Sequence, residues 1–135
     1  MTQDEPAASD VDKTVVGRRR RAPIWSLTAE GSKSIKLVGT SALIGRNPAS
    51  TAEYPRAQLV TLADPDKTVS KTHAHLSLAD GRWSITDLNS TNGVYLMSAS
   101  EDETEIEIGI RVEATESFRL GDLTINLRAE GSAHD

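Results

Sequence analysis

Polar and apolar residues alternate with a period of two along most of this chain, which is the pattern of half-buried β-strands. The apolar positions recur at Ile35/Leu37, Leu76/Leu78, Trp83/Ile85, Val94/Leu96, Ile106/Ile108, Phe118/Leu120 and Leu123/Ile125/Leu127. Turn-forming residues interrupt the alternation at 29–34, 39–41, 80–81, 89–93, 98–105 and 121–122. No stretch has the period of an amphipathic helix. Many short strands without helical crossovers predict an all-β fold, an antiparallel β-sandwich of about eleven strands.

One long segment breaks this pattern. Residues 47–66 contain three prolines and a single strand-like piece, Gln58–Leu62. Proline cannot donate a hydrogen bond to a β-ladder, so it is rare in central strands. We therefore expect a long excursion between two core strands.

Length and composition favour one domain flanked by tails. A chain of 135 residues, 37% of them hydrophobic, can bury one core but is short for two. Residues 1–22 are polar, lack periodicity and end in the run Arg18–Arg21. We expect a flexible N-terminal tail over 1–22, a folded domain over 23–129 and a C-terminal tail over 130–135.

Several classes of function fit the composition poorly. The chain has no cysteine, which excludes disulfides and thiolate metal sites. Its net charge of −5 argues against a general affinity for nucleic acid, and no apolar run approaches the roughly 20 residues that span a bilayer. The acidic N-terminus lacks the apolar segment of a secretory signal. We expect a cytoplasmic protein, or a domain on the cytoplasmic face of a membrane if the chain belongs to a longer protein.

Polar residues at three strand ends supply the groups that a phosphate site requires. Such a site needs a cation with directed donors, a hydroxyl and free backbone N–H groups at a turn. Arg46 follows a strand-like segment, and Ser70 and Lys71 belong to a later turn. Thr91 and Asn92 lie on another turn. Because polar loops at one end of a rigid sheet commonly bind a ligand, we predict a pocket for a phosphate group.

In this order and strand context, the residues resemble a known family. Gly45-Arg46, Ser70-x-x-His73 and Ser90-Thr91-Asn92-Gly93 are similar to the motifs of the forkhead-associated (FHA) domain, and the resemblance covers residues 23–129. It implies a bacterial, actinobacterial-type β-sandwich that binds phosphothreonine peptides through loops at one end. It also implies that the protein has no catalytic activity and no cofactor.

The resemblance implies a role for each position of the site. Arg46 and Ser70 would hold the phosphate, and Lys71 would contact the phosphate or the peptide backbone. Thr91 would line the phosphothreonine pocket, and Asn92 would pair with the peptide main chain beside the phosphothreonine.

Three further positions, Gly45, His73 and Gly93, match residues that shape the loops of the family without touching the ligand. The chain departs from the family in one respect. Its span from Arg46 to Ser70 is longer than usual, so the resemblance does not predict the surface beside the pocket.

Two other chemistries start from the histidines. His73 and His75 would share one face of a strand, but a zinc site needs further ligands and only His134 remains, so we expect no metal. Ser70, His73 and Asp87 would provide the groups of a hydrolytic triad, yet nothing in the sequence resembles a nucleophile elbow or an oxyanion loop. We therefore expect no enzyme and interpret His73 as a buried residue that organises the loops.

The N-terminal tail contains a candidate phosphorylation site. Thr14 is preceded by acidic residues and followed by Val15-Val16, which resembles the phosphoacceptor site in the tails of some small actinobacterial FHA proteins. We hypothesise that a Ser/Thr kinase phosphorylates Thr14 and that the tail then occupies its own pocket. The Arg18–Arg21 run has a simpler interpretation as a solvated segment or a nonspecific contact for anions.

These features predict a phosphothreonine-peptide-binding module that acts downstream of Ser/Thr protein kinases. Segments 47–66 and 98–104 would read peptide residues C-terminal to the phosphothreonine. One alternative is a phosphate-independent scaffold, which would bind phosphorylated and unphosphorylated partners equally. Another is a regulatory FHA domain cut from a larger, for example membrane, protein. A nucleic-acid or anionic-membrane ligand would depend on the arginine run, so that deleting 1–22 would remove binding.

Overall fold

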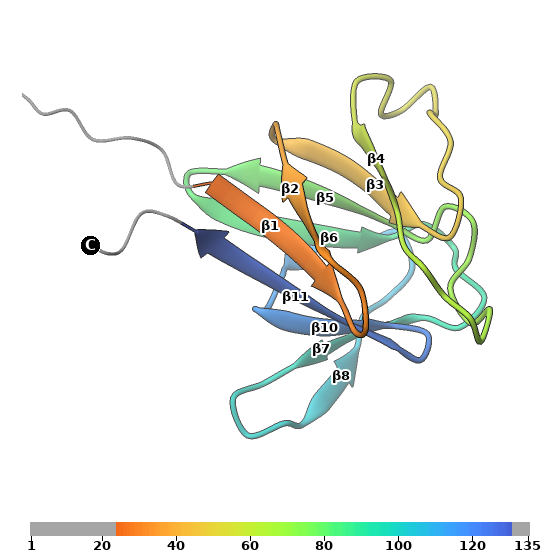
Figure 1. Cartoon of the computed structure of the whole chain (residues 1–135), viewed down its shortest axis with the longest axis vertical. Coiled ribbons are helices and arrows are strands. Elements are labelled where there is room, and N and C mark those ends of the chain that lie inside the picture. The colour runs from red at the N-terminus through yellow and green to blue at the C-terminus, as the bar shows by residue number, and fades with distance from the viewer. Residues whose placement is uncertain (1–23, 131–135) are drawn as a thin grey trace, which may run out of the picture.

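The computed structural model describes residues 24–130, which form eleven β-strands and no helix (Figure 1). Within this range, therefore, no helix has the length and apolar character needed to cross a membrane. The strands are β1 (Ile24–Ala29), β2 (Ser34–Leu37), β3 (Ser41–Gly45), β4 (Gln58–Thr61), β5 (Ala74–Ala79), β6 (Arg82–Asp87), β7 (Val94–Met97), β8 (Glu103–Glu105), β9 (Val112–Glu113), β10 (Ser117–Leu120) and β11 (Leu123–Glu130).

The strands form two sheets, which confirms the predicted all-β sandwich. The six-stranded sheet has the order β2-β1-β11-β10-β7-β8, and the five-stranded sheet has the order β4-β3-β5-β6-β9. The alternating apolar residues face each other between the sheets and form one core. Its largest fully buried side chains include Phe118, Leu27, Leu76, Ile85 and Ile125.

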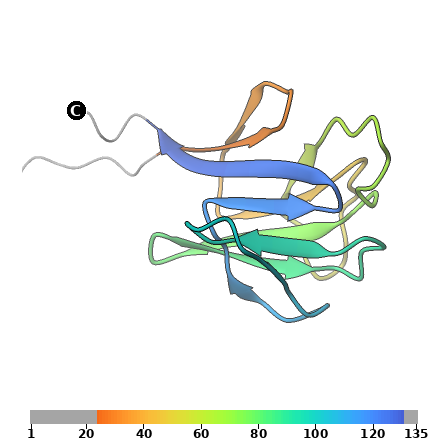
Figure 2. The same cartoon turned by 90° about the horizontal axis from the view of Figure 1, so that it is seen from below.

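The strand directions bring four turns to one end of the sandwich. Ile44 near the end of β3 pairs with Ala74 at the start of β5, and Ala74 pairs with Asp87 at the end of β6. In the other sheet, Leu120 at the end of β10 pairs with Val94 at the start of β7. Figures 1 and 2 show the connections after β3, β6 and β10 and the connection before β5 gathered at the right-hand end of the molecule. The polar motifs all lie in these connections.

The hairpin signal at Asp80-Gly81 and the strand-like piece within the excursion are both found in the structure. Asp80 and Gly81 have φ values of 55° and 77° and connect β5 to β6, as a tight primed turn requires. The strand-like piece forms β4.

One strand pair departs from the antiparallel pattern. β4 runs parallel to β3, with Ala42 opposite Gln58 and Gly45 opposite Thr61. Parallel neighbours require a connection that returns to the starting end of the sheet. Residues 46–57 make that return, so the length of the excursion has a topological reason.

The excursion packs against the outer face of the five-stranded sheet. The ring of Tyr54 stacks on that of His75 in β5, with the ring centroids 3.6 Å apart and an interplanar angle of 11°. Pro48 is buried, and the backbone N–H of Ala49 donates to Oγ1 of Thr72, 3.2 Å away. The segment is therefore an ordered part of the domain.

The strand expected at Ile106/Ile108 is wrong. Ile106 is buried, but Ile108 is 57% exposed and lies in a bend between β8 and β9. Gly109, with a φ of 82°, turns the chain there. β8, in contrast, lies inside the predicted break because all three of its residues are exposed and show no apolar alternation.

Candidate functional site

The backbone of Gly45-Arg46 lies directly against the turn that contains Ser70 and Lys71. The N–H of Arg46 donates to the carbonyl of Ser70, and the N–H of Asn47 donates to that of Lys71, both over 3.0 Å. A Cβ atom at Gly45 would lie 2.9 Å from the Ser70 oxygen and would overlap the Lys71 carbonyl. Glycine is therefore required at this position for the two segments to approach each other.

Two cations lie at this junction, and neither has an acidic partner in the part of the chain that the structure describes. Nε of the half-buried Arg46 donates to the carbonyl of Val69 over 3.2 Å, which leaves its terminal nitrogens for other acceptors. Lys71 is exposed. Among residues 24–130, no carboxylate lies within ion-pair distance of either side chain. The junction is therefore a positively charged turn with unused donors.

Hydrogen bonds join this turn to the one that contains Thr91 and Asn92. The N–H of Thr91 donates to Oγ of Ser70 over 3.1 Å. Because that bond uses the Ser70 oxygen as an acceptor, the hydroxyl proton is left for another acceptor, such as a phosphate oxygen. Nδ2 of Asn92 donates to the carbonyl of Thr68 over 2.8 Å, and Oδ1 of the same side chain stays available. The five predicted ligand-binding residues thus lie in one connected group of turns.

The side chain of His73 connects the turn at Ser70 with the turn at Gly93. This side chain is fully buried. Nδ1 accepts the N–H of Ser70 over 3.0 Å, so the ring proton is on Nε2, which donates to the carbonyl of Gly93 over 2.8 Å. Both ring nitrogens are bonded to backbone groups, so neither can accept the Ser70 hydroxyl proton. The triad interpretation therefore has no geometric basis.

The second histidine lies in a separate environment. Nε2 of His75 is 2.7 Å from Oγ of Ser41, and its ring is covered by Tyr54. His73 precedes β5, whereas His75 lies within it, and the two rings make no common contact among the described residues.

Supporting residues that the sequence did not single out complete the turns. Oδ2 of Asp64 accepts the N–H of Val69 over 2.7 Å, and Oγ1 of Thr68 accepts the N–H of Asp122 over 2.9 Å. No local pattern indicates either contact.

Asp87, considered above for a triad, and Ser90 of the FHA-like motif make a third supporting contact, whose local signal is an aspartate three residues before a serine in a turn. Oδ1 of Asp87 accepts the N–H of Ser90 over 2.8 Å, and Oγ of Ser90 accepts the N–H of Gly93 over 3.0 Å. Gly93 has a φ of 85°, so the turn also favours glycine there.

The buried histidines make stability depend on pH. Burial lowers the pKa of His73 below 6.5, against the opposing effects of the Gly93 carbonyl and Asp87, and burial also lowers that of His75. Below the ordinary pKa the unfolded chain then binds more protons than the folded one. We expect the free energy of unfolding to be maintained above about pH 6.5 and to fall as the pH is lowered through that value.

Urea unfolding at about pH 7.5 and about pH 5.5 measures this effect. The variant His75→Gln removes the share of His75, so the dependence that persists belongs to His73. A flat profile in that variant would contradict the assignment.

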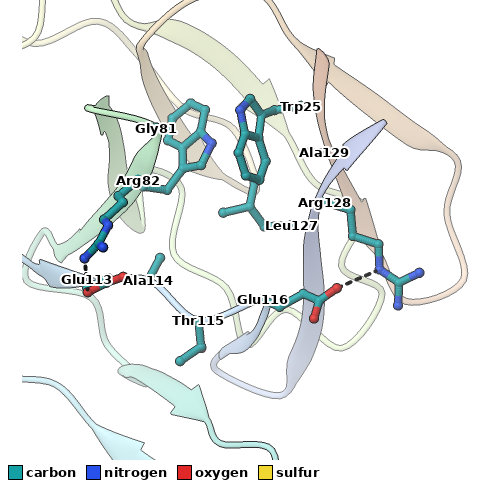
Figure 3. Close-up of a pocket in the computed structure, with 11 residues that line it drawn as sticks. Trp25, Gly81, Arg82, Glu113, Ala114, Thr115, Glu116, Leu127, Arg128 and Ala129 are labelled. Carbon is teal, nitrogen blue, oxygen red and sulfur yellow. Dashed lines mark ion pairs between the residues drawn. The ribbon is translucent and has the colours of Figure 1, made fainter. Parts of the chain in front are cut away.

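Figure 3 shows a different pocket, of about 340 Å³. Gly81 and Arg82 at the β5–β6 turn line it, so it lies at the end of the sandwich opposite Arg46 and Ser70. Trp25 and Leu127 line it, and two exposed ion pairs flank it, Arg82–Glu113 at 3.9 Å and Arg128–Glu116 at 3.5 Å. It contains none of the predicted site residues.

Comparison with known proteins agrees with the motifs. The model of the FHA domain family matches residues 42–121, a span that contains the turns described above. The chain belongs to the FHA domain family. FHA domains are non-catalytic binding modules, in agreement with the expectation that this chain is no enzyme.

The relatives of this FHA domain include bacterial proteins. It is 32% identical over 111 residues to FhaB of Mycobacterium tuberculosis and of Mycolicibacterium smegmatis, which covers 82% of this chain and 64% of each relative. The chain therefore spans less than two thirds of their length. A solved structure from a structural and functional analysis of phosphothreonine-dependent FHA domain interactions shares the fold, with a TM-score of 0.53 at 24% identity, covering 78% of this chain and 95% of that one.

Proposed function

We propose that this FHA domain binds phosphothreonine peptides with Arg46 and Ser70 on the phosphate. The observation that carries the proposal is the proximity of two cations, which have no acidic partner among residues 24–130, to a serine hydroxyl that can donate its proton. A phosphomonoester has about −1.5 to −2 charges and three strong acceptor oxygens, which match these donors. Oxyanions that are inserted between such groups form short, charge-assisted hydrogen bonds.

The remaining residues have supporting roles in the proposal. Lys71 adds charge at the rim of the pocket, where its exposed ammonium group can reach the phosphate or the peptide backbone. Thr91 lines the pocket. Asn92 offers its Oδ1 to a peptide N–H, since its Nδ2 is already bonded to Thr68.

Titration with phosphothreonine peptides and their unphosphorylated counterparts tests the proposal. Binding should require the phosphate. Equal affinity for both forms would favour the phosphate-independent scaffold instead.

We further propose that the protein acts in the cytoplasm, downstream of a Ser/Thr protein kinase, with residues 23–129 as the binding domain between two tails. Thr14, the Arg18–Arg21 run and His134 lie outside the described residues.

The proposal includes the segment 47–66, but not 98–104, in the surface that contacts peptide residues beside the phosphothreonine. The segment 98–104 follows β7, which runs from Val94, at the end of the sandwich that contains Arg46 and Ser70, to Met97 at the opposite end.

The tail is long enough for phosphorylated Thr14 to occupy the pocket of its own molecule. Ile24 pairs with Glu130 at the end of the sandwich opposite the turns that contain Ser70 and Thr91. The eight residues of β11 span about 27 Å, whereas ten residues from Thr14 to Ile24 reach about 33–36 Å when extended. A tethered ligand has a high effective concentration, so modest affinity is enough to close the site.

Phosphorylating Thr14 is expected to shift the amide resonances of Ser70, Lys71 and Asn92 in NMR spectra, independently of protein concentration. The Arg46→Ala variant, phosphorylated in the same way, serves as the control and should show no such shifts. Shifts that are absent in the native sequence, or that grow with protein concentration, would show that the tail does not occlude its own pocket.

A further inference from the structure

Asn92 is the asparagine of this chain that is followed by glycine, and such a pair is chemically reactive. Asn47 precedes a proline, whereas Asn89 and Asn126 precede residues with a side chain. Proline has no N–H, and a Cβ atom hinders the backbone nitrogen beside it, but glycine presents its nitrogen to the neighbouring side-chain amide without that obstacle. Asn92 is also exposed to solvent. Cyclisation of the chain is therefore most favourable at this position.

The reaction at this pair requires water and no other reagent. The backbone nitrogen of Gly93 gives its proton to hydroxide and attacks Cγ of Asn92. A C–N bond forms, the bond from Cγ to Nδ2 breaks, and Nδ2 takes up a proton from water and leaves as ammonia. Water then adds to either carbonyl of the cyclic imide and opens it. The products are aspartate and isoaspartate, in which the main chain runs through the side-chain carbon.

The folded turn directs both reacting groups elsewhere. The N–H of Gly93 is buried and donates to Oγ of Ser90 over 3.0 Å, so hydroxide cannot reach its proton. Nδ2 of Asn92 donates to the carbonyl of Thr68 over 2.8 Å, which anchors the side-chain amide to a different segment. Each group would have to give up its hydrogen bond before the two could react.

The other side of Gly93 is held as well. Its carbonyl accepts the N–H of Gly121 over 3.0 Å and Nε2 of His73 over 2.8 Å. The nitrogen of Gly93 can swing toward Asn92 only when the turn opens. Local opening of this kind has its own free energy, which is smaller than that of global unfolding. The stability of the turn therefore sets the rate of the reaction.

We propose that Asn92 is a deamidation site that the closed turn protects and whose conversion inactivates the phosphate site. The inactivation rests on the proposed phosphothreonine binding, whereas the protection does not. A carboxylate at this position has no donor for the carbonyl of Thr68, so two oxygens would face each other without a proton. Its negative charge would also lie next to Thr91, whose N–H binds Ser70, and would repel a bound phosphate.

The first test measures protection in the whole chain, incubated in neutral buffer. Peptide mapping separates asparagine, aspartate and isoaspartate at position 92. Ser90→Ala removes the acceptor of the Gly93 N–H and should speed conversion about fivefold or more, the factor that one net hydrogen bond contributes to an opening equilibrium. Ser98→Ala is the matched control, because Oγ of Ser98 also accepts a backbone N–H, that of Asp102, at the opposite end of the sandwich. It should leave the rate at Asn92 unchanged.

The native chain unfolded in urea provides a comparison that does not depend on how Ser90→Ala folds. Conversion at Asn92 should be about tenfold faster or more in the unfolded chain, since the turn is then open. Equal rates in the folded and unfolded native chain would overturn the protection. An unchanged rate in a folded Ser90→Ala protein would overturn the part assigned to the bond between Gly93 and Ser90.

The second test measures inactivation. Ion exchange separates the aged native chain into unmodified and deamidated protein, because deamidation adds a negative charge. Both fractions and Asn92→Asp are titrated with a phosphothreonine peptide and its unphosphorylated counterpart. The deamidated fraction and Asn92→Asp should bind the phosphorylated peptide about tenfold more weakly or worse.

The outcomes separate this inference from the proposed function. Phosphate-dependent binding of equal strength in the two fractions would overturn the inactivation alone. An unmodified chain that binds both peptides equally would overturn the proposed function and the inactivation together, and the protection of Asn92 is then decided by the conversion rates.

Discussion

Arg46→Ala is expected to abolish phosphothreonine-peptide binding while the domain stays folded. The guanidinium supplies directed, charged donors to the phosphate, each worth about 1.5–3 kcal/mol. Losing two of them weakens binding by about 100-fold or more. The folded state loses only one such bond among the described residues, which the half-buried guanidinium donates to the Val69 carbonyl over 3.2 Å. That bond is worth about 1.5–3 kcal/mol, so the domain stays folded.

Peptide titration and thermal unfolding of the same preparations separate the two effects. Arg82→Ala is the matched control, since Arg82 is an exposed arginine at the opposite end of the sandwich, beside the β5–β6 turn. It should bind the peptide as the native chain does. An unchanged affinity in Arg46→Ala would remove Arg46 from the phosphate site.

Gly45→Ala is expected to damage both stability and binding. The added methyl group would overlap the backbone carbonyl of Lys71 and lie 2.9 Å from the Ser70 oxygen. Backbone atoms cannot rotate away as a flexible side chain can, so the turn must move from Arg46. Overpacking of this kind costs about 1–3 kcal/mol, and the displaced Ser70 would no longer align with the guanidinium.

Gly39→Ala isolates the effect of the close approach. An added Cβ there has nothing within 4 Å, and its φ lies outside the left-handed region. Urea unfolding and peptide titration should leave this variant close to the native chain. If Gly45→Ala matched it in both measurements, the contact between the turns would not be needed for the site.

The parts of the fold that could be predicted are those with a local signature. Burial on one face produces the period-two alternation of β6 and β11, and positive φ values produce the Asp80-Gly81 hairpin signal. The chemical groups of the site were also readable, because its phosphate-binding candidates cluster in short polar motifs.

Other features have no local signature. β8 is wholly exposed, so an alternation of apolar and polar residues could not predict it. Ile108 continues the alternation that includes Ile106, but the turn at Gly109 ends the extended segment there. The parallel pairing of β3 and β4 follows from where the excursion returns to the sheet, which single-residue preferences do not specify.

Residue order thus established that this is a two-sheet protein with polar turns of phosphate-binding chemistry. The tertiary structure decided which residues of these turns contact each other. Ser70 meets Thr91 across 21 residues of sequence, and Arg46 meets Val69 across 23. Tyr54 and Ile108 line one hollow from separate connections. Such contacts arise only when both sheets have folded around the common core, because a local pattern reports the solvent exposure of a segment and not its distant neighbours.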